Sequence, residues 1–208
     1  MDSRFLCVPA AVVFTICSYG FGIAKVICTD TKDSDLHTKI RPLGDLIASG
    51  EGDYGSVNRG KAGDTPGGLE SITGKPYSAT TIKEITDLQR NEIFAVGRYQ
   101  FIPSTMQIAL RYSCIHNDDL FTQETQERLF AVLIFEKRPS VGGYIKGEHD
   151  DLNLAGRELA KEFAAVEYKG GRGFYDGLHG NKANITQDEV QSVLTDLRRS
   201  WNSFEVKS

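Results

Sequence analysis

Residues 122–138, TQETQERLFAVLIFEKR, decide the fold class of this chain. Thr122 is a suitable N-cap, because its hydroxyl can accept a hydrogen bond from a backbone N–H of the first helical turn. Residues 129–135 are apolar on nearly every side, which is typical of a helix at the centre of a helical domain. We therefore expect a mostly α fold in which other helices surround this one.

Further helical patterns of apolar residues lie on both sides of the central segment, in residues 38–51, 79–89, 103–115, 152–166 and 186–201. Two of these segments begin with a capping box, in which Thr81 pairs with Glu84 and Thr186 pairs with Glu189. Strand signals are weak, and only residues 71–80, SITGKPYSAT, suggest a short β-hairpin.

Glycines cluster in residues 50–74 and 142–180, which predicts long ordered loops. The chain has 208 residues, which is room for one domain with at most a small appendage. Its formal net charge of -4 leaves no basic stripe that would neutralise phosphates, so nucleic acid is not expected as a partner. We expect a single mostly α domain over residues 25–208.

Residues 1–24 contain the apolar stretch FLCVPAAVVFTICSYGFGIA, followed by a polar segment. Gly22 and Ala24 are small residues at the spacing that a signal peptidase requires, so we interpret 1–24 as a secretory signal peptide. The alternative is an uncleaved anchor that contacts the membrane, because about 20 apolar residues can span a bilayer. The first interpretation predicts a periplasmic or secreted protein, and the second a membrane-anchored protein facing the periplasm.

Cysteine and histidine positions bear on disulfides and metals. Cys7 and Cys17 lie in the leader, so an exported chain keeps Cys28 and Cys114. In an oxidising compartment these two are a disulfide candidate, and the alternative is two buried free thiols. There is no CxxC or HxxxH pattern and the histidines are scattered, so neither a metal nor another cofactor is expected; they are His37, His116, His149 and His179.

Glu51 lies between Gly50 and Gly52 where the helical pattern of 38–51 ends. The C-terminal end of a helix is the negative pole of its dipole, and this disfavours an ionised carboxylate there. If apolar groups also cover the side chain, the pKa of Glu51 rises and the group can act as a general acid. The competing interpretation is a solvated loop glutamate.

Residues 94–106, FAVGRYQFIPSTM, combine groups that suit a sugar cleft. Gln100 offers donors and an acceptor for a sugar amide or hydroxyl, while Tyr99 and Phe101 offer flat faces. The alternative is that both aromatic residues belong to the core and Gln100 bonds only to backbone.

ASGEG at 48–52, followed by GRYQFIPSTM at 97–106, resembles the lysozyme-like superfamily, in particular its lytic transglycosylase and goose-type muramidase branch. The family's G-x-x-Q-x-x-P-x-T segment is matched position for position by Gly97, Gln100, Pro103 and Thr105. The order of SGEGDYGSVNRG, FAVGRYQFIPST, ELAKEFAAV and FYDG…NKA also resembles phage- and bacteriocin-associated muralytic domains. The resemblance spans roughly residues 40–185 and implies a lysozyme-like single domain.

The resemblance implies that Glu51 is the general acid and later the general base, and that Gln100 hydrogen-bonds the sugar near the scissile bond. It places one ring of Tyr99 and Phe101 in the cleft and the other in the core. The family's A-Y-N motif is absent, and Tyr175, in preference to Tyr144, is the candidate to replace its tyrosine.

A hydrolase with two carboxylates needs a second acidic group across the bond. Asp53 is the nearest candidate in sequence, with Asp64 and Glu92 as alternatives, although Asp53 and Asp64 also suit loop turns and Glu92 a solvated position. Tyr54 and Asn58 are further candidates for substrate binding.

The function expected from these residues is a muramidase that cleaves the β-1,4 bond between N-acetylmuramic acid and N-acetylglucosamine in peptidoglycan. The alternatives are a lytic transglycosylase, which forms 1,6-anhydro products, and a catalytically inactive protein that binds cell-wall carbohydrate. The expected partners are peptidoglycan glycan strands and, for a toxin, an immunity or inhibitor protein. The expected state is a monomer.

Overall fold

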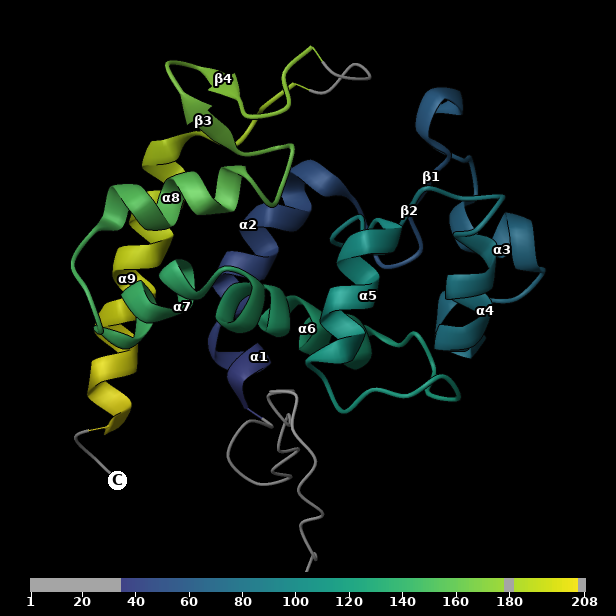
Figure 1. Ribbon diagram of the computed structural model, residues 1–208, viewed down its shortest axis with the longest axis horizontal. Coiled ribbons are helices and arrows are strands. Elements are labelled where there is room, and N and C mark those ends of the chain that lie inside the picture. The colour runs from purple at the N-terminus through teal and green to yellow at the C-terminus, as the bar shows by residue number, and fades with distance from the viewer. Residues whose placement is uncertain (1–34, 178–181, 206–208) are drawn as a thin grey trace, which may run out of the picture.

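The computed structural model describes residues 35–177 and 182–205 (Figure 1). The chain is mostly helical within these ranges, as predicted. The helices are α1 Leu36–Lys39, α2 Arg41–Glu51, α3 Gly68–Thr73, α4 Ile82–Leu88, α5 Pro103–Arg111, α6 Gln123–Val132, α7 Pro139–Lys146, α8 Leu152–Ala160 and α9 Gln187–Glu205. The strands are β1 Val57–Asn58, β2 Ala95–Val96, β3 Glu167–Lys169 and β4 Arg172–Gly173.

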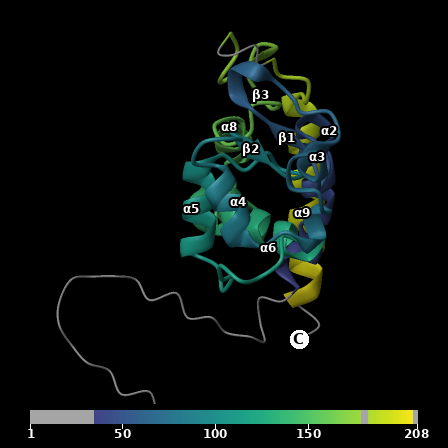
Figure 2. The same cartoon turned by 90° about the vertical axis from the view of Figure 1, so that its right-hand side faces the viewer.

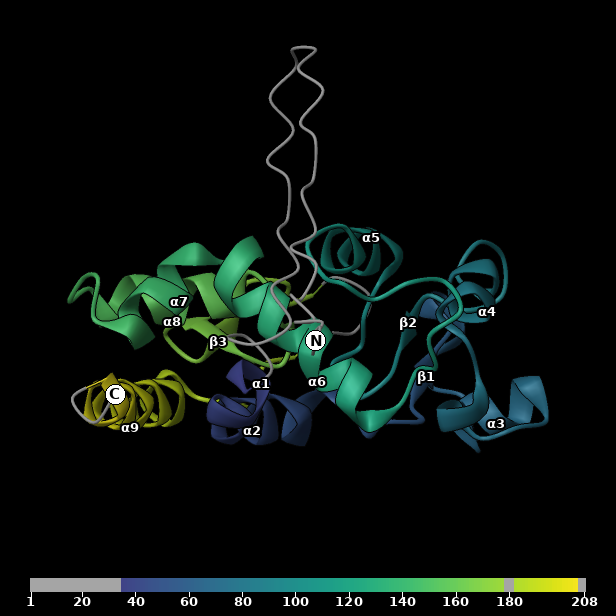
Figure 3. The same cartoon turned by 90° about the horizontal axis from the view of Figure 1, so that it is seen from below.

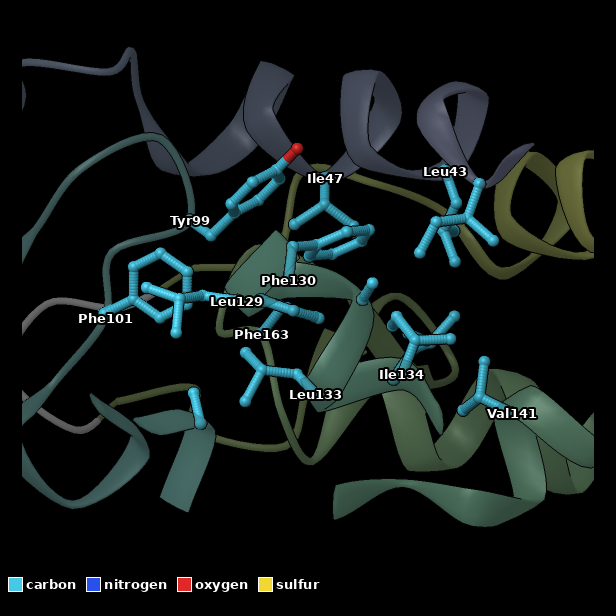
Figure 4. Packing of buried hydrophobic residues seen from close by; sticks show 14 of the residues in the cluster. Leu43, Ile47, Tyr99, Phe101, Leu129, Phe130, Leu133, Ile134, Val141 and Phe163 are labelled. Atoms are coloured by element: carbon cyan, nitrogen blue, oxygen red, sulfur yellow. The ribbon is translucent and has the colours of Figure 1, made fainter. Parts of the chain in front are cut away.

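The central helix predicted from residues 122–138 is confirmed as α6, whose N-cap Thr122 accepts a hydrogen bond from the Thr125 N–H. The helix continues into a π-helical segment, Leu133–Lys137, which the sequence pattern does not distinguish from α-helix. α6 packs against α1, α2 and α5. Its Phe130 stacks on Tyr99 with ring centroids 4.2 Å apart, and both rings lie in the main core (Figure 4).

α7, α8 and α9 pack against one another, and α9 also contacts α2. Viewed from below, α2 and α9 lie on one side of the domain, and α5, α7 and α8 lie on the other (Figure 3). Both capping boxes are confirmed, because Thr81 and Glu84 exchange hydrogen bonds at the start of α4, as Thr186 and Glu189 do at the start of α9.

A smaller lobe contains α3, α4 and the two-stranded antiparallel sheet of β1 and β2 (Figures 1 and 2). Val57 pairs with Val96, and Asn58 pairs with Ala95. This sheet is short, but it joins the chain that follows α2 to the chain that precedes α5. It therefore brings together two segments that are distant in sequence.

The predicted hairpin at residues 71–80 is wrong. These residues form the end of α3 and the 3-10 turn Tyr77–Ala79. The hairpin is instead β3–β4, inside the glycine-rich segment that was expected to be a loop. α7 also lies in a glycine-rich stretch, and its Gly142 and Gly143 are buried. A Cβ atom at Gly142 would lie 2.6 Å from Cδ1 of Phe135, which is too close without movement.

None of the helices in the described ranges combines the length and the apolar character needed to cross a bilayer. The expected signal peptide or anchor at residues 1–24 lies outside those ranges, as does Cys28. The pairing of Cys28 with Cys114 therefore stays a prediction, and so does the export of the chain.

The last turn of α2 lies close to the segment that precedes β3. A Cβ atom added at Gly50 would lie 2.5 Å from Cβ of Ala165 and 2.6 Å from Oδ1 of Asn184. These distances are shorter than carbon and oxygen atoms tolerate without movement. Gly50 is therefore required for the close approach between α2 and Ala165.

We expect Gly50→Ala to destabilise the fold by about 1–3 kcal/mol, which is the usual cost of forcing extra atoms into a packed site. Alanine is a better helix former than glycine, so helix propensity alone predicts the opposite sign. Ser49→Ala is the control, because Ser49 is exposed in the same turn and already has a Cβ atom. Urea unfolding measures both variants. A Gly50→Ala protein as stable as the wild type would contradict the proposed packing.

Candidate active site

A cleft of about 640 Å³ lies where the β1–β2 sheet joins the helical lobe. Its lining consists of residues 51–57, Tyr77, Gln100 and five residues of the 64–70 segment, namely Asp64, Thr65, Gly67, Gly68 and Glu70. The Gly97 N–H donates to the Ser56 carbonyl at 2.8 Å, in continuation of the strand pairing. The two segments singled out in the sequence thus meet, and Glu51 and Gln100 line the same cleft.

Glu51 is the last residue of α2 and is partly buried. Its Oε1 accepts a hydrogen bond from the Ala165 N–H at 3.0 Å. Burial raises the pKa of Glu51 above its ordinary value, and hydrogen bonding from the backbone at 164–165 opposes this only in part. The location at a helix C-terminus also disfavours the charged form. This side chain is therefore suited to hold a proton in the cleft.

Gln100 has a φ of 45°, and no other non-glycine residue in the described part of the chain has a positive φ. Its side chain donates from Nε2 to the Gly97 carbonyl at 2.9 Å. A Cβ atom added at Gly52, another cleft-lining residue, would lie 3.5 Å from Gln100 Nε2 and only 2.8 Å from Ser56 Oγ. Strained backbone is common at functional sites, where surrounding contacts hold it in place. The Gly97–Gln100 turn thus presents the Gln100 amide beside Gly52.

Three further carboxylates line the cleft: Asp53, Asp64 and Glu70. Oδ1 of Asp53 accepts hydrogen bonds from the Gly55 N–H at 2.9 Å and from Ser56 Oγ at 3.1 Å, so Asp53 also closes a turn. Oδ1 of Asp64 accepts a hydrogen bond from Asn58 Nδ2 at 2.8 Å. Glu70 was not among the predicted candidates. Glu92 is exposed after α4 and is not among the cleft-lining residues.

Tyr54 and Tyr77 form an aromatic wall of the cleft. Their rings stack with centroids 5.9 Å apart and an interplanar angle of 21°. Tyr54 was a predicted binding residue, and the structure places it in the cleft. Tyr77 was missed, because it lies in the segment that was interpreted as a hairpin and only its aromatic character beside a turn would have marked it.

The prediction that one ring of Tyr99 and Phe101 faces the cleft is wrong. Both side chains are buried, with exposed fractions of 2% and 0%. The turn at Gly97–Gln100, in which Gln100 has a positive φ, leaves both rings in the core while the Gln100 side chain lines the cleft. The Tyr99 ring lies beside Phe130, and its hydroxyl points towards α2 (Figure 4).

Two further substrate-binding predictions are not supported by the geometry. Asn58 is not a cleft-lining residue, because its amide bonds to Asp64 and to the Gly60 N–H. Tyr175 is not one either, because its hydroxyl donates to the Lys161 carbonyl at 2.8 Å and its ring packs on Phe174. Tyr144, the other candidate for the missing motif, is buried between His149 and Arg198.

In the described ranges, no group of three or more His, Cys, Asp or Glu side chains is arranged to hold a metal ion. Comparison with protein-family models, with curated proteins and with solved structures gave no match. The functional argument therefore depends on the motifs and on the geometry of the cleft.

The raised pKa of Glu51 predicts a pH-dependent stability. A group whose pKa is higher in the folded state contributes stability at low pH, and this stability is lost as pH rises through the folded-state pKa. Glutamine has no ionised form and can still accept the Ala165 hydrogen bond. We therefore expect Glu51→Gln to have a higher Tm than the wild type at pH 7, and the difference to disappear near pH 4.

Thermal unfolding over this pH range measures the effect, with Glu92→Gln as the control for loss of an exposed carboxylate. A Glu51→Gln protein that is no more stable than the wild type at pH 7 would mean that ionised Glu51 is not disfavoured by the fold.

Proposed function

We propose that this protein is a muralytic glycosidase with Glu51 as its general acid and base. The observation that carries the proposal is that the Glu51 carboxyl has a raised pKa and lines one cleft together with Gln100. A carboxylic acid that keeps its proton near neutral pH can protonate the oxygen of a glycosidic bond as it breaks. The proposed substrate bond is the β-1,4 link between N-acetylmuramic acid and N-acetylglucosamine.

The cleft offers a role for each part of such a substrate. Gln100 is the proposed hydrogen-bonding partner of the sugar beside the scissile bond. Tyr54 and Tyr77 provide aromatic surface on which a sugar ring can lie. After bond cleavage Glu51 is ionised, and it can then accept a proton from the nucleophile that completes the reaction.

The architecture is also compatible with a lysozyme-like fold. A helical lobe with a buried central helix adjoins a smaller lobe that contains a short antiparallel sheet, and the cleft lies at their junction. Glu51 lies at the end of a helix on this junction, which is where the motif resemblance expects the acid. This arrangement supports the proposal without depending on any single additional residue.

We favour hydrolysis over the transglycosylase reaction because further carboxylates line the cleft. A hydrolase can use one of them as a base or nucleophile, whereas in a transglycosylase the 6-hydroxyl of the substrate attacks. Asp53 and Asp64 are the candidates retained from the sequence, and Glu70 joins them. Asp53 and Asp64 each also have a structural hydrogen bond.

We expect Glu51→Gln to lower the release of soluble fragments from purified peptidoglycan by at least about 100-fold, since general acid catalysis contributes about 10²–10⁴-fold. Glu92→Gln should retain wild-type activity, because Glu92 is exposed and outside the cleft. Dye release from labelled sacculi measures both. Wild-type activity in Glu51→Gln would refute the assignment of the general acid.

Mass spectrometry of the digestion products distinguishes the two enzyme classes. We expect reducing N-acetylmuramic acid ends, since water is the proposed nucleophile. Products that end in 1,6-anhydro sugars would instead identify a lytic transglycosylase. A wild-type protein that binds sacculi and releases no fragments would support the alternative of an inactive carbohydrate-binding protein.

The proposed site of action is the periplasm or the exterior of the cell, which depends on the interpretation of residues 1–24 as a signal peptide or anchor. Host lysis, antibacterial attack and wall remodelling all use the same chemistry, and the cleft does not distinguish among them. An immunity protein is expected only for the antibacterial role.

A further inference from the structure

Two polar residues, Gln126 and Glu127, are buried side by side in the first turns of α6, just before its apolar run begins at Leu129. Gln126 has an exposed fraction of 0%, and Glu127 has one of 3%. Buried polar groups are costly unless they are fully hydrogen-bonded. Most of their partners, Tyr54, Arg98 and Tyr99, lie in the two segments that form the cleft, and Gln126 also donates to the Phe121 carbonyl just before α6.

Gln126 connects the backbones of these segments. Its Nε2 donates to the Tyr54 carbonyl at 3.0 Å, and its Oε1 accepts from the Arg98 N–H at 2.9 Å. A Cβ atom at Gly97 would lie 2.5 Å from Gln126 Oε1, so glycine is needed there for the connection to form.

Glu127 connects side chains of the same two segments. Its Oε2 accepts from the Tyr99 hydroxyl at 2.6 Å, and its Oε1 accepts from the Tyr54 hydroxyl at 2.7 Å. Nε of Arg98 lies 3.6 Å from Oε1, and the Arg98 guanidinium also lies over the Tyr54 ring at 4.9 Å. Arg41 contributes a second cation, with Nη1 3.9 Å from Oε1. Two cations and two phenols thus hold one carboxylate.

The two phenols that share Glu127 differ in location. Tyr99 is buried in the core, whereas Tyr54 lines the cleft. α6 holds the second cleft tyrosine as well, because Gln123 Nε2 donates to the Tyr77 hydroxyl at 3.0 Å. The orientation of both stacked rings is therefore set from the first turns of the central helix.

We propose that Glu127 is a positioning residue, which fixes the Tyr54 ring against Tyr77 as a preformed platform for a sugar ring. The role of the platform in binding glycan depends on the proposed function, whereas the fixing of the Tyr54 ring by Glu127 is independent of that function. Pre-organised contact surfaces bind more tightly because little freedom is lost when the ligand arrives.

Tyr54→Phe and Tyr99→Phe form a matched pair, since each removes one hydroxyl from the same carboxylate and keeps the ring. Both substitutions are made in a Glu51→Gln background, so that no turnover occurs. Calorimetry then measures the Kd of each protein for soluble peptidoglycan glycan fragments. We expect Tyr54→Phe to raise Kd by about fivefold or more, which corresponds to about 1 kcal/mol. Tyr99→Phe should lower Tm and leave Kd within about twofold. Equal effects of the two variants on Kd would overturn the proposal.

A second measurement is independent of glycan binding. Tetranitromethane reacts with exposed phenolates, and burial together with the Glu127 carboxylate raises the pKa of Tyr54. We expect Glu127→Gln to accelerate nitration of Tyr54 several-fold relative to the exposed Tyr112 in the same molecule, as quantified by peptide mass spectrometry. Should Glu127→Gln fail to fold, Glu127→Asp replaces it, because the shorter side chain withdraws the carboxylate from Tyr54.

The two measurements separate the two hypotheses. A wild-type protein without glycan binding or fragment release would refute the proposed function, and the nitration result would still decide whether Glu127 fixes Tyr54. An unchanged ratio of Tyr54 to Tyr112 nitration would overturn the positioning role.

Discussion

Shielding of the Glu51 carboxyl from water is the constraint on which the proposed chemistry depends. It arises from the close approach of the last turn of α2 to the segment before β3, which the absence of a side chain at Gly50 permits. The Ala165 N–H then reaches Oε1 of Glu51 and fixes the direction of the carboxyl. Desolvation and the negative end of the helix dipole favour the protonated form, while the backbone hydrogen bond favours the ionised form. Since desolvation is the larger effect, the pKa is raised.

The cleft is coupled to the core through α6. The helix contributes Phe130 to the core. Its Gln126 and Glu127 also form hydrogen bonds to Tyr54, in the segment that follows Glu51, and to the turn that ends at Gln100. The β1–β2 pairing joins the same segments a second time. The strand pairing and the hydrogen bonds from α6 together explain how Glu51 and Gln100, about fifty positions apart in the sequence, line the same cleft. They also explain how Gln100 is maintained in a φ region that non-glycine residues rarely occupy.

Local signals in the sequence were sufficient to predict much of this arrangement. Gly50 and Gly52 placed Glu51 at the end of α2, and the capping boxes at Thr81 and Thr186 located the starts of α4 and α9 correctly. Each of these features depends on residues within one helical turn. The helical interpretation of residues 122–138 succeeded for a similar reason, because continuous apolar character is itself a local property.

Several features that depend on distant contacts were left open or wrongly assigned from the sequence, although the burial of both Tyr99 and Phe101 was named there as the alternative. Tyr99 became a core residue because its hydroxyl meets Glu127 and its ring meets Phe130, and neither contact is visible in a local pattern. Tyr77 joined the cleft only through its stacking on Tyr54. Tyr175 was assigned by analogy with an absent motif, and its hydroxyl instead bonds to the chain just after α8.

The central claim, that the fold raises the pKa of Glu51 above that of an exposed glutamate, is tested most directly by ¹³C NMR titration of the side-chain carboxyl carbons. Glu51 is assigned as the signal that is lost in Glu51→Gln. The account predicts that this signal titrates at a higher pH than the exposed glutamates of the same protein. A Glu51 signal that titrates with the exposed glutamates, or below them, would contradict the account.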